Sequence, residues 1–212
     1  MNVVDPSETG RALTPKGRAT RARIVAAAAQ LVFERGVAGT TLEDVRGAAG
    51  VSFSQLYHYF ADKMSLIRAV IAHQTDAVLS RQDAFLGHLD NVRAFRRWRD
   101  FLVANQRHLG CEGGCPLGTL ASELSETFPK ARGNLAVAFG RWEDGIRTGL
   151  RAMYERGELR SDVDPDRLAL AMLAAVQGGL LLTQVRRNPS PLEAALDAMI
   201  DHIESCIVSK AS

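Results

Sequence analysis

The sequence contains few cysteines, carries almost no net charge and lacks an apolar run at its start, and its composition excludes several classes of protein. Three cysteines among 212 residues are too few for a disulfide scaffold and fit a reducing cytoplasm. Asp5 and Glu8 stand in the first ten residues, which lack an apolar run, so we expect no signal peptide there. A 46% share of hydrophobic residues and a 24% share of charged ones exclude a wholly disordered or fibrous chain.

Motifs for catalysis and metal binding are also missing. The sequence offers no Ser-His-Asp order and no phosphate-binding loop, and its five histidines are scattered without paired spacing. We therefore expect no catalytic residues, no metal site and no cofactor. Cys111 and Cys115 stand four apart in a glycine-rich stretch. This pair leaves metal or redox sensing open beside a plain packing role.

The net charge of +2 would by itself argue against a nucleic-acid partner, but the charge is unevenly distributed. Arg11, Lys16, Arg18, Arg21 and Arg23 follow one another with no acidic residue between them. Residues 1–70 carry a net charge of +3, and the remaining 142 residues carry −1. This asymmetry indicates a modestly basic N-terminal part on a neutral body, which suits a DNA partner better than the average does.

Apolar residues recur at helical spacing along the chain, and no alternation typical of strands appears, so the sequence predicts an all-α protein. Residues 1–14 read as a flexible tail, and a first helix runs from Arg18 to Gly36. Later helices are expected over residues 91–109, around 117–126, from the region of Leu135 to Gly157, from Pro165 to Arg187, and over 192–207. A break is expected near Pro129.

Two short helices between these segments carry capping signals. Thr41 and Asp44 form one Thr-x-x-Asp pair, and Ser52 and Gln55 form a Ser-x-x-Gln capping box. Gly50 joins the two helices and tolerates the positive φ that such a turn needs. Two capped helices joined in this way predict a helix-turn-helix. The second of them, residues 53–59, is then the candidate recognition helix, and a long helix follows Asp62.

The residues of this region resemble a known family. The run Leu56-Tyr57-His58-Tyr59-Phe60-x-Asp62-Lys63, with Gly50-Val51-Ser52 before it, resembles the DNA-binding domain of TetR-family transcriptional repressors over residues 18–70. The stretch Gly114-Cys115-Pro116-Leu117-Gly118, with Gln177-Gly178-Gly179, resembles the LmrA/YxaF-type subgroup. The resemblance implies a helix-turn-helix DNA-binding domain over 15–63 and a larger helical ligand-binding and dimerisation domain over 64–208.

The resemblance also implies which residues meet DNA. Candidates for base and phosphate contacts are Arg18, Arg21, Thr41, Phe53, Ser54, Gln55, Tyr57, His58, Tyr59 and Lys63. Two positions depart from the family pattern, since many members have a very small residue in place of Ser54 and a small residue in place of Arg46. Phe53 is unusual on a surface that faces the major groove; it either touches a thymine methyl group or folds back onto the protein. Arg46, where small residues are common, is either an extra phosphate contact or a solvated side chain.

A ligand pocket is expected between the later helices, where aromatic residues and a few polar groups recur. The candidate lining residues are Trp98, Phe101, Cys115, Leu120, Phe139, Trp142, Gln177 and Leu181. Asn105, Gln106 and Glu123 are further polar candidates. The aromatic residues also have the spacing of an ordinary core, so packing alone is the alternative role.

No charged residue occurs between Leu168 and Val185, a length that reaches the threshold for a membrane span. Gln177, Gly178 and Thr183 interrupt this stretch, and a helix that is apolar all round is typical of a core or an interface. We therefore expect no membrane span. A homodimer is expected instead, formed by this helix and by the last one, between Leu192 and Ile207.

These expectations combine into a cytoplasmic, ligand-responsive transcriptional regulator. A homodimer would present its recognition helices about 34–36 Å apart to a near-palindromic double-stranded operator. A small, largely apolar effector that prefers another conformation would release it. The alternative is an all-α carrier or enzyme that uses the aromatic pocket. The sequence leaves open the effector, the operator and whether the ligand releases or promotes DNA binding.

Overall fold

The computed structural model describes residues 13–208, and the regular elements of this part of the chain are all α-helices. The β structure within it is limited to an isolated bridge between Leu159 and Ile207. The all-α prediction is therefore confirmed. The expected flexible tail lies outside the described residues, apart from Leu13 and Thr14.

Contacts divide the described chain into two compact units. One contains the residues up to Ala77 together with Thr119–Ala136, and the other contains Val78–Gly118 and the residues from Val137 onward. The expected domain boundary between residues 63 and 64 stays a prediction, because a grouping by contacts does not test where a domain folds on its own.

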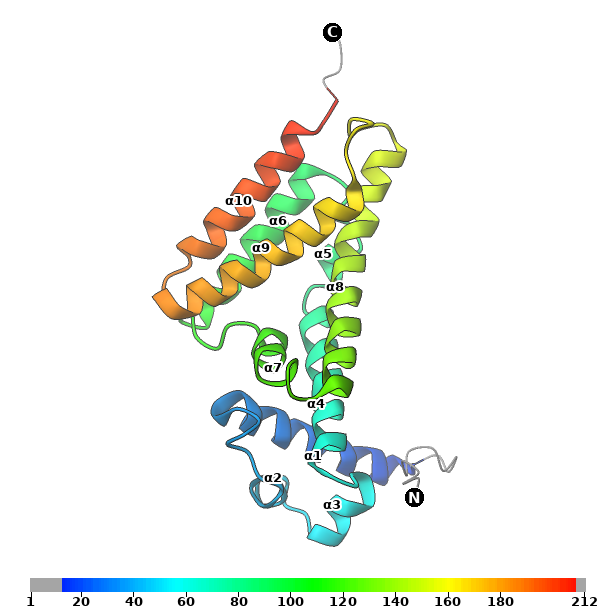
Figure 1. Cartoon of the computed structure of the whole chain (residues 1–212), viewed down its shortest axis with the longest axis vertical. Helices are drawn as coiled ribbons and strands as arrows, with labels where there is room; N and C mark the ends of the chain where they lie inside the picture. The colour runs from blue at the N-terminus through cyan, green and yellow to red at the C-terminus, as the bar shows by residue number, and fades with distance from the viewer. Residues whose placement is uncertain (1–12, 209–212) are drawn as a thin grey trace. The chain divides into compact units, whose positions relative to one another are not determined.

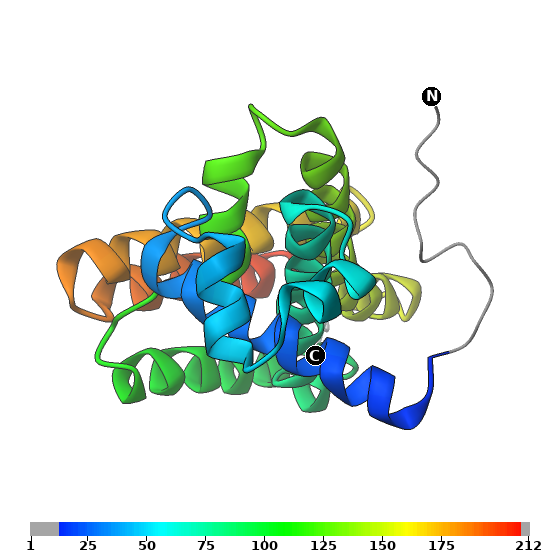
Figure 2. The same ribbon diagram turned by 90° about the horizontal axis from the view of Figure 1, so that it is seen from below.

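The first unit is built on α1 (Pro15–Arg35), α2 (Leu42–Ala49), α3 (Phe53–Tyr59) and most of α4 (Lys63–Ser80). Figure 2 shows α2 and α3 beside α1. Each helix turns an apolar face inward, with Ile24, Val45, Leu56, Phe60 and Leu66 at most 2% exposed. The short α2 and α3 are therefore held by this shared core, since helices of their length are marginal alone.

Both predicted capping boxes are present. The Thr41 hydroxyl accepts the Asp44 N–H at 3.1 Å, and the Asp44 carboxylate accepts the Thr41 N–H at 2.9 Å. Ser52 and Gln55 repeat the arrangement at 3.1 and 3.0 Å. Gly50 adopts the left-handed conformation, with φ 60° and ψ 44°, between the two helices. The helix-turn-helix is thus set by local sequence, since the caps satisfy helix-end N–H groups.

The second unit contains α5 (Asp83–Leu86), α6 (Val92–His108), most of α8 (Pro129–Glu155), α9 (Pro165–Arg186) and α10 (Ser190–Ser205). In Figure 1, α9 and α10 run antiparallel, and α10 also packs on α6. The unit boundary falls inside α7 (Pro116–Leu124). The interruption expected near Pro129 is present over residues 125–128, and Pro129 itself begins α8, because the first turn of a helix accepts proline. One expectation needs correction. The helix α1 begins at Pro15, before Arg18, because Thr14 caps it.

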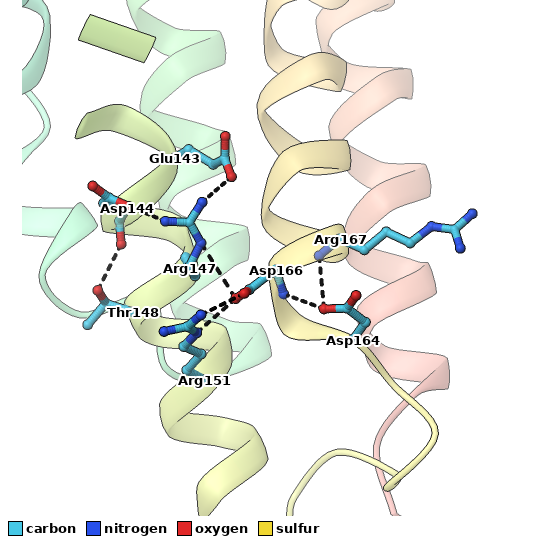
Figure 3. Close-up of polar contacts among 8 residues, drawn as sticks. All are labelled: Glu143, Asp144, Arg147, Thr148, Arg151, Asp164, Asp166 and Arg167. Carbon is cyan, nitrogen blue, oxygen red and sulfur yellow. Dashed lines mark hydrogen bonds and ion pairs between the residues drawn. The ribbon is translucent and has the colours of Figure 1, made fainter. Parts of the chain in front are cut away.

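An ion-pair network joins α8 to the start of α9 (Figure 3). Arg151 contacts both carboxylate oxygens of Asp166, at 2.8 and 2.6 Å, and Arg147 Nε lies 3.5 Å from Asp166 Oδ1. Asp164 caps α9 by accepting the N–H groups of Asp166 and Arg167 at 2.9 and 3.2 Å. The hydrogen bond from Arg151, with the charges of Arg151 and Arg147, lowers the pKa of Asp166.

The lowered pKa of Asp166 predicts a pH-dependent contribution to stability. A carboxylate with a depressed folded-state pKa stabilises the fold above its unfolded pKa, about 4, and loses this effect as pH falls through the folded pKa. We expect Asp166→Asn to be less stable than the parent above about pH 5. The two urea unfolding curves should converge in more acidic solution. A difference that stays constant from pH 7 to pH 3 would contradict this role.

The helix α9 is long and apolar enough to cross a membrane, with 44% of its most apolar window buried within the protein. This is weak evidence for a span, because core helices of soluble proteins pass the same test. Leu168, Met172, Val176 and Leu180 of α9 are buried in the second unit. Its composition is thus explained in part by the core.

Candidate nucleic-acid interface

Helix α3 presents the predicted recognition surface to solvent. Ser54, Gln55, Tyr57 and His58 are exposed, and Phe53 joins them with 42% of its surface exposed. Leu56 and Phe60 are buried on the opposite side, and Tyr57, which core packing alone would bury, is 51% exposed. The exposed side chains are of the kinds that contact base edges and phosphates.

Tyr59 does not share this exposed face. It is half-buried, and its hydroxyl lies 3.5 Å from the place that a Cβ on Gly17 would take. The ring of Tyr59 also packs edge-on against His58, with ring centroids 4.8 Å apart. Tyr59 thus points toward α1, unlike the exposed residues predicted on α3. A contact between its hydroxyl and DNA stays a prediction.

Two other predicted contacts are already engaged within the protein. The Lys63 ammonium donates to the Val37 carbonyl at 2.6 Å, and an ammonium has further protons available for a phosphate. The Thr41 hydroxyl serves the α2 cap and donates to the Asp44 carboxylate at 2.5 Å. Hydrogen bonds from the Thr41 hydroxyl and then its backbone lower the pKa of Asp44. Both residues therefore stabilise the helix-turn-helix, and their contacts with DNA stay predictions.

The arginines of α1 lie in different settings. Arg18 and Arg21 are exposed; Arg18 donates to the Leu13 carbonyl at 2.6 Å, and Arg21 lies 5.2 Å from the centroid of the Phe60 ring. Arg23 donates to the Ala49 carbonyl at 2.9 Å. Arg23 therefore stabilises the end of α2, whereas Arg18 and Arg21 keep a guanidinium edge toward solvent, as phosphate contacts require.

Glu123 has a role that the sequence did not predict. Its carboxylate accepts the Val37 N–H at 2.7 Å, and it lies 3.1 Å from the place that a Cβ on Gly36 would occupy. The same Val37 peptide segment is held from its carbonyl side by Lys63. Glu123, a polar candidate for the ligand pocket, thus anchors the loop between α1 and α2. The pattern of residues in α7 does not indicate this role of Glu123, because its partner Val37 lies far away in the sequence.

The interior of the second unit distinguishes its two tryptophans. Trp98 and Trp142 are both buried. The Trp98 indole N–H donates to the Gln82 side-chain oxygen at 2.9 Å, whereas Trp142 Nε1 and Gln106 Oε1 are buried without a hydrogen-bond partner. Unpaired buried polar atoms are costly and need an explanation. They are therefore candidates for bonding a small molecule.

The other predicted lining residues are not all brought together. Phe101 is half-buried and stacks on Phe85 at 4.8 Å, and Phe139 is also half-buried. Leu120 is buried but belongs to the first unit. Leu181 is 59% exposed on α9. A pocket lined by the whole predicted set stays a prediction.

All three cysteines are buried, and none of them forms a disulfide. Burial raises the pKa of the Cys115 thiol, and hydrogen bonds with the backbone of Gly118 and Leu117 and with the Gln177 side chain oppose this rise. A thiol with a raised pKa is mostly protonated at neutral pH and is a weak nucleophile. Within residues 13–208, no group of three or more His, Cys, Asp or Glu side chains is placed to hold a metal ion.

Two family models match this chain. Residues 24–70 match "Bacterial regulatory proteins, tetR family", which covers the helix-turn-helix. Residues 90–199 match "Tetracyclin repressor-like, C-terminal domain". The two matches correspond to the capped α2–α3 pair and to most of the later helices.

Individual relatives and solved structures of the same family are also similar to this chain. The chain is 27% identical over 181 residues to the HTH-type transcriptional repressor DhaR of Mycobacterium sp. strain GP1, covering 85% of this chain and 90% of the relative. It is 31% identical over 163 residues to the probable HTH-type transcriptional regulator ArpR of Pseudomonas putida, covering 75% and 77%. A TetR transcriptional regulator from Chloroflexus aurantiacus J-10-FL superposes with a TM-score of 0.78 at 30% identity, covering 92% and 98%. The chain belongs to the TetR family of DNA-binding transcriptional regulators, which are not enzymes.

Proposed function

We propose that this protein is a homodimeric repressor that a small neutral effector releases from a near-palindromic operator in the cytoplasm. The observation that carries the proposal is the exposed face of α3, where Ser54, Gln55, Tyr57 and His58 stand on a helix held by its N-terminal capping box and a buried Leu56. A short, rigidly supported helix with such a face suits insertion into the major groove.

The dimer contact is proposed on α9 and α10. Leu170, Leu181, Leu182 and Val185 are large apolar residues of α9 with 56%, 59%, 46% and 72% of their surface exposed. A row of exposed apolar side chains on one helix is typical of a protein–protein interface. The half of α9 that the core does not cover would thus pack on a second copy of the chain, with α10 beside it.

The interior of the second unit supports a neutral effector with a polar group. Among the described residues of the second unit, the buried polar side chains are Gln82, Gln106 and Thr183, all uncharged. A buried charge without a partner is very costly. The free Trp142 N–H would donate to a carbonyl or hydroxyl oxygen of the effector, and Gln106 Oε1 would accept from a hydroxyl or amide. The LmrA/YxaF-like character of residues 114–118 and 177–179 is part of the same proposal.

The DNA-facing assignment is tested by selecting bound duplexes from a random pool and then measuring affinity for the selected operator. We expect Tyr57→Ala to weaken operator binding about tenfold, since an exposed aromatic side chain with a polar tip would lose both its phosphate and its base contacts. Affinity of the parent protein should fall steeply with salt, because phosphate contacts release counterions.

Phe33→Ala is the matched control. Phe33 is an exposed aromatic residue of α1 in the same unit, 47% exposed, and its replacement should leave operator affinity unchanged. Thermal unfolding should change by a similar small amount in both variants, because both side chains are about half exposed. Enrichment of no common sequence from the pool, or unchanged affinity in Tyr57→Ala, would overturn the assignment.

A further inference from the structure

Phe53 occupies an unusual place for a large apolar side chain. It is the first residue of α3 and 42% of its surface is exposed, next to Tyr57, which is 51% exposed. Their rings are stacked, with centroids 6.1 Å apart and an interplanar angle of 21°. Phe53 thus does not fold back into the core of the first unit, and it remains on the face that carries the other predicted base contacts.

Arg46 holds this ring from the neighbouring helix. Its guanidinium carbon lies 5.2 Å from the centroid of the Phe53 ring, within the range of a cation–π contact. Glu43, one turn earlier on α2, bonds the guanidinium through Nε at 3.1 Å and also through Nη2. Arg46, Phe53 and Tyr57 therefore form a continuous group on the surface of α2 and α3, called here the Arg46–Phe53–Tyr57 stack.

The hydrogen bonds that Arg46 donates to the Glu43 carboxylate, with the negative charge of that carboxylate, raise the pKa of Arg46. A guanidinium that is paired with a carboxylate and laid over a ring is poorly suited to clamp a phosphate. Its planar shape instead supports an aromatic ring. The geometry therefore favours a positioning role for Arg46 over an independent contact with the DNA backbone.

A ring held in this way in the major groove has one natural apolar partner. Among the edges of the four base pairs, the C5-methyl group of thymine is the apolar feature of that groove. We propose that Phe53 reads the C5-methyl group of a pyrimidine in each operator half-site, and that Arg46 positions the ring for this contact. The proposal rests on the DNA-facing assignment of α3. By the same chemistry, 5-methylcytosine should substitute for thymine in the contact, since its methyl group occupies the same C5 position.

The test uses the full-length protein and the duplex operator selected from the random pool. One thymine position at a time is replaced by deoxyuridine, and the change is made at the equivalent position of both half-sites. This replacement removes only the methyl group. For the parent protein, one position should lose about fourfold in affinity per half-site, the effect of one buried methyl group. At that position, 5-methylcytosine opposite guanine should bind more tightly than cytosine opposite guanine by a similar factor.

Three variants separate the roles. Phe53→Ala should bind the thymine and deoxyuridine duplexes equally, and Phe53→Leu, which keeps an apolar side chain, should retain part of the discrimination. Arg46→Lys keeps the positive charge but lacks the planar guanidinium, so the methyl discrimination should fall while the salt dependence of binding stays unchanged. Phe33→Ala should discriminate as the parent protein does.

The possible outcomes distinguish this inference from the proposed function. If a specific operator is selected but no thymine position shows a methyl effect that Phe53→Ala removes, the reading by Phe53 is wrong and the DNA-binding assignment stands. If Arg46→Lys keeps full discrimination but changes the salt slope, Arg46 is a phosphate contact and not a positioning residue. If no operator is selected at all, the proposed function fails, and this inference fails with it.

Discussion

Replacing Gly149 by alanine is expected to destabilise the protein by about 3 kcal/mol and to lower its Tm by about 6–12 °C. Gly149 is buried in the C-terminal half of α8. A Cβ on this residue would lie 1.9 Å from the Leu89 carbonyl oxygen and 2.4 Å from the Leu89 carbonyl carbon. Because both atoms belong to the backbone, the segment that follows α5 would have to move away from α8, and a rotamer change alone cannot relieve the clash.

Gly140→Ala provides the matched control on the same helix. No atom lies within 4 Å of a Cβ built on Gly140, and alanine is favoured over glycine in a helix interior by about 0.5–1 kcal/mol. We therefore expect this variant to be slightly more stable than the parent protein. Thermal and urea unfolding of the two variants measure the contrast. Equal stabilities would show that Leu89 does not pack on α8 at Gly149.

Replacing Glu123 by leucine is expected to cost about 2 kcal/mol of stability and to weaken operator binding. The change removes the acceptor of the Val37 N–H, a 2.7 Å bond to a buried residue that is 6% exposed. A buried donor without a partner costs about 1–3 kcal/mol, and the lost bond is charge-assisted. The loop that Glu123 anchors leads into Thr41, the cap of α2, so the helix-turn-helix should be held less firmly.

Glu123→Gln and Glu126→Gln complete this experiment. Glutamine at position 123 keeps an acceptor but not its charge, so we expect roughly half of the loss. Glu126 is exposed just beyond α7, and its replacement should change stability by less than about 0.5 kcal/mol. If Glu123→Leu and Glu126→Gln unfold alike, the anchor contributes nothing. Chemical denaturation measures stability, and gel shifts on the selected operator measure affinity.

Most of the helical fold could be predicted from local sequence because its signals are local. The bounds of α2 and α3 followed from Thr41, Ser52 and Gly50, each of which acts within a few residues of itself. The interruption expected near Pro129 is present over residues 125–128, and it too has a local cause, since proline ends helices and is accepted in their first turn. The short α5 was not predicted, because its four residues make about one helical turn, and an apolar periodicity can be recognised only over several turns.

The candidate site was predictable in kind but not in its arrangement. That Phe53 and Tyr57 lie on an exposed face of α3 agrees with their place in the motif, whereas the role of Arg46 depends on the angle at which α2 meets α3. Glu123 was expected among the pocket residues and anchors the loop at Val37. Its partner lies 86 residues earlier in the chain, and no pattern along a single helix encodes such a pairing.

From the sequence alone, the apolar spacing and the two capping pairs determined a helical protein with a helix-turn-helix, and the uneven charge determined its modestly basic N-terminal part. Caps, apolar spacing and turn glycines act over one or two helical turns, so they can be read directly from neighbouring residues. The tertiary structure decided which polar groups already have a partner within the protein. The Trp98 N–H bonds Gln82 and the Lys63 ammonium bonds the Val37 carbonyl, whereas the buried Trp142 N–H has no partner. These choices depend on contacts between segments distant in sequence, where packing and the need to pair buried polar groups select one partner among many.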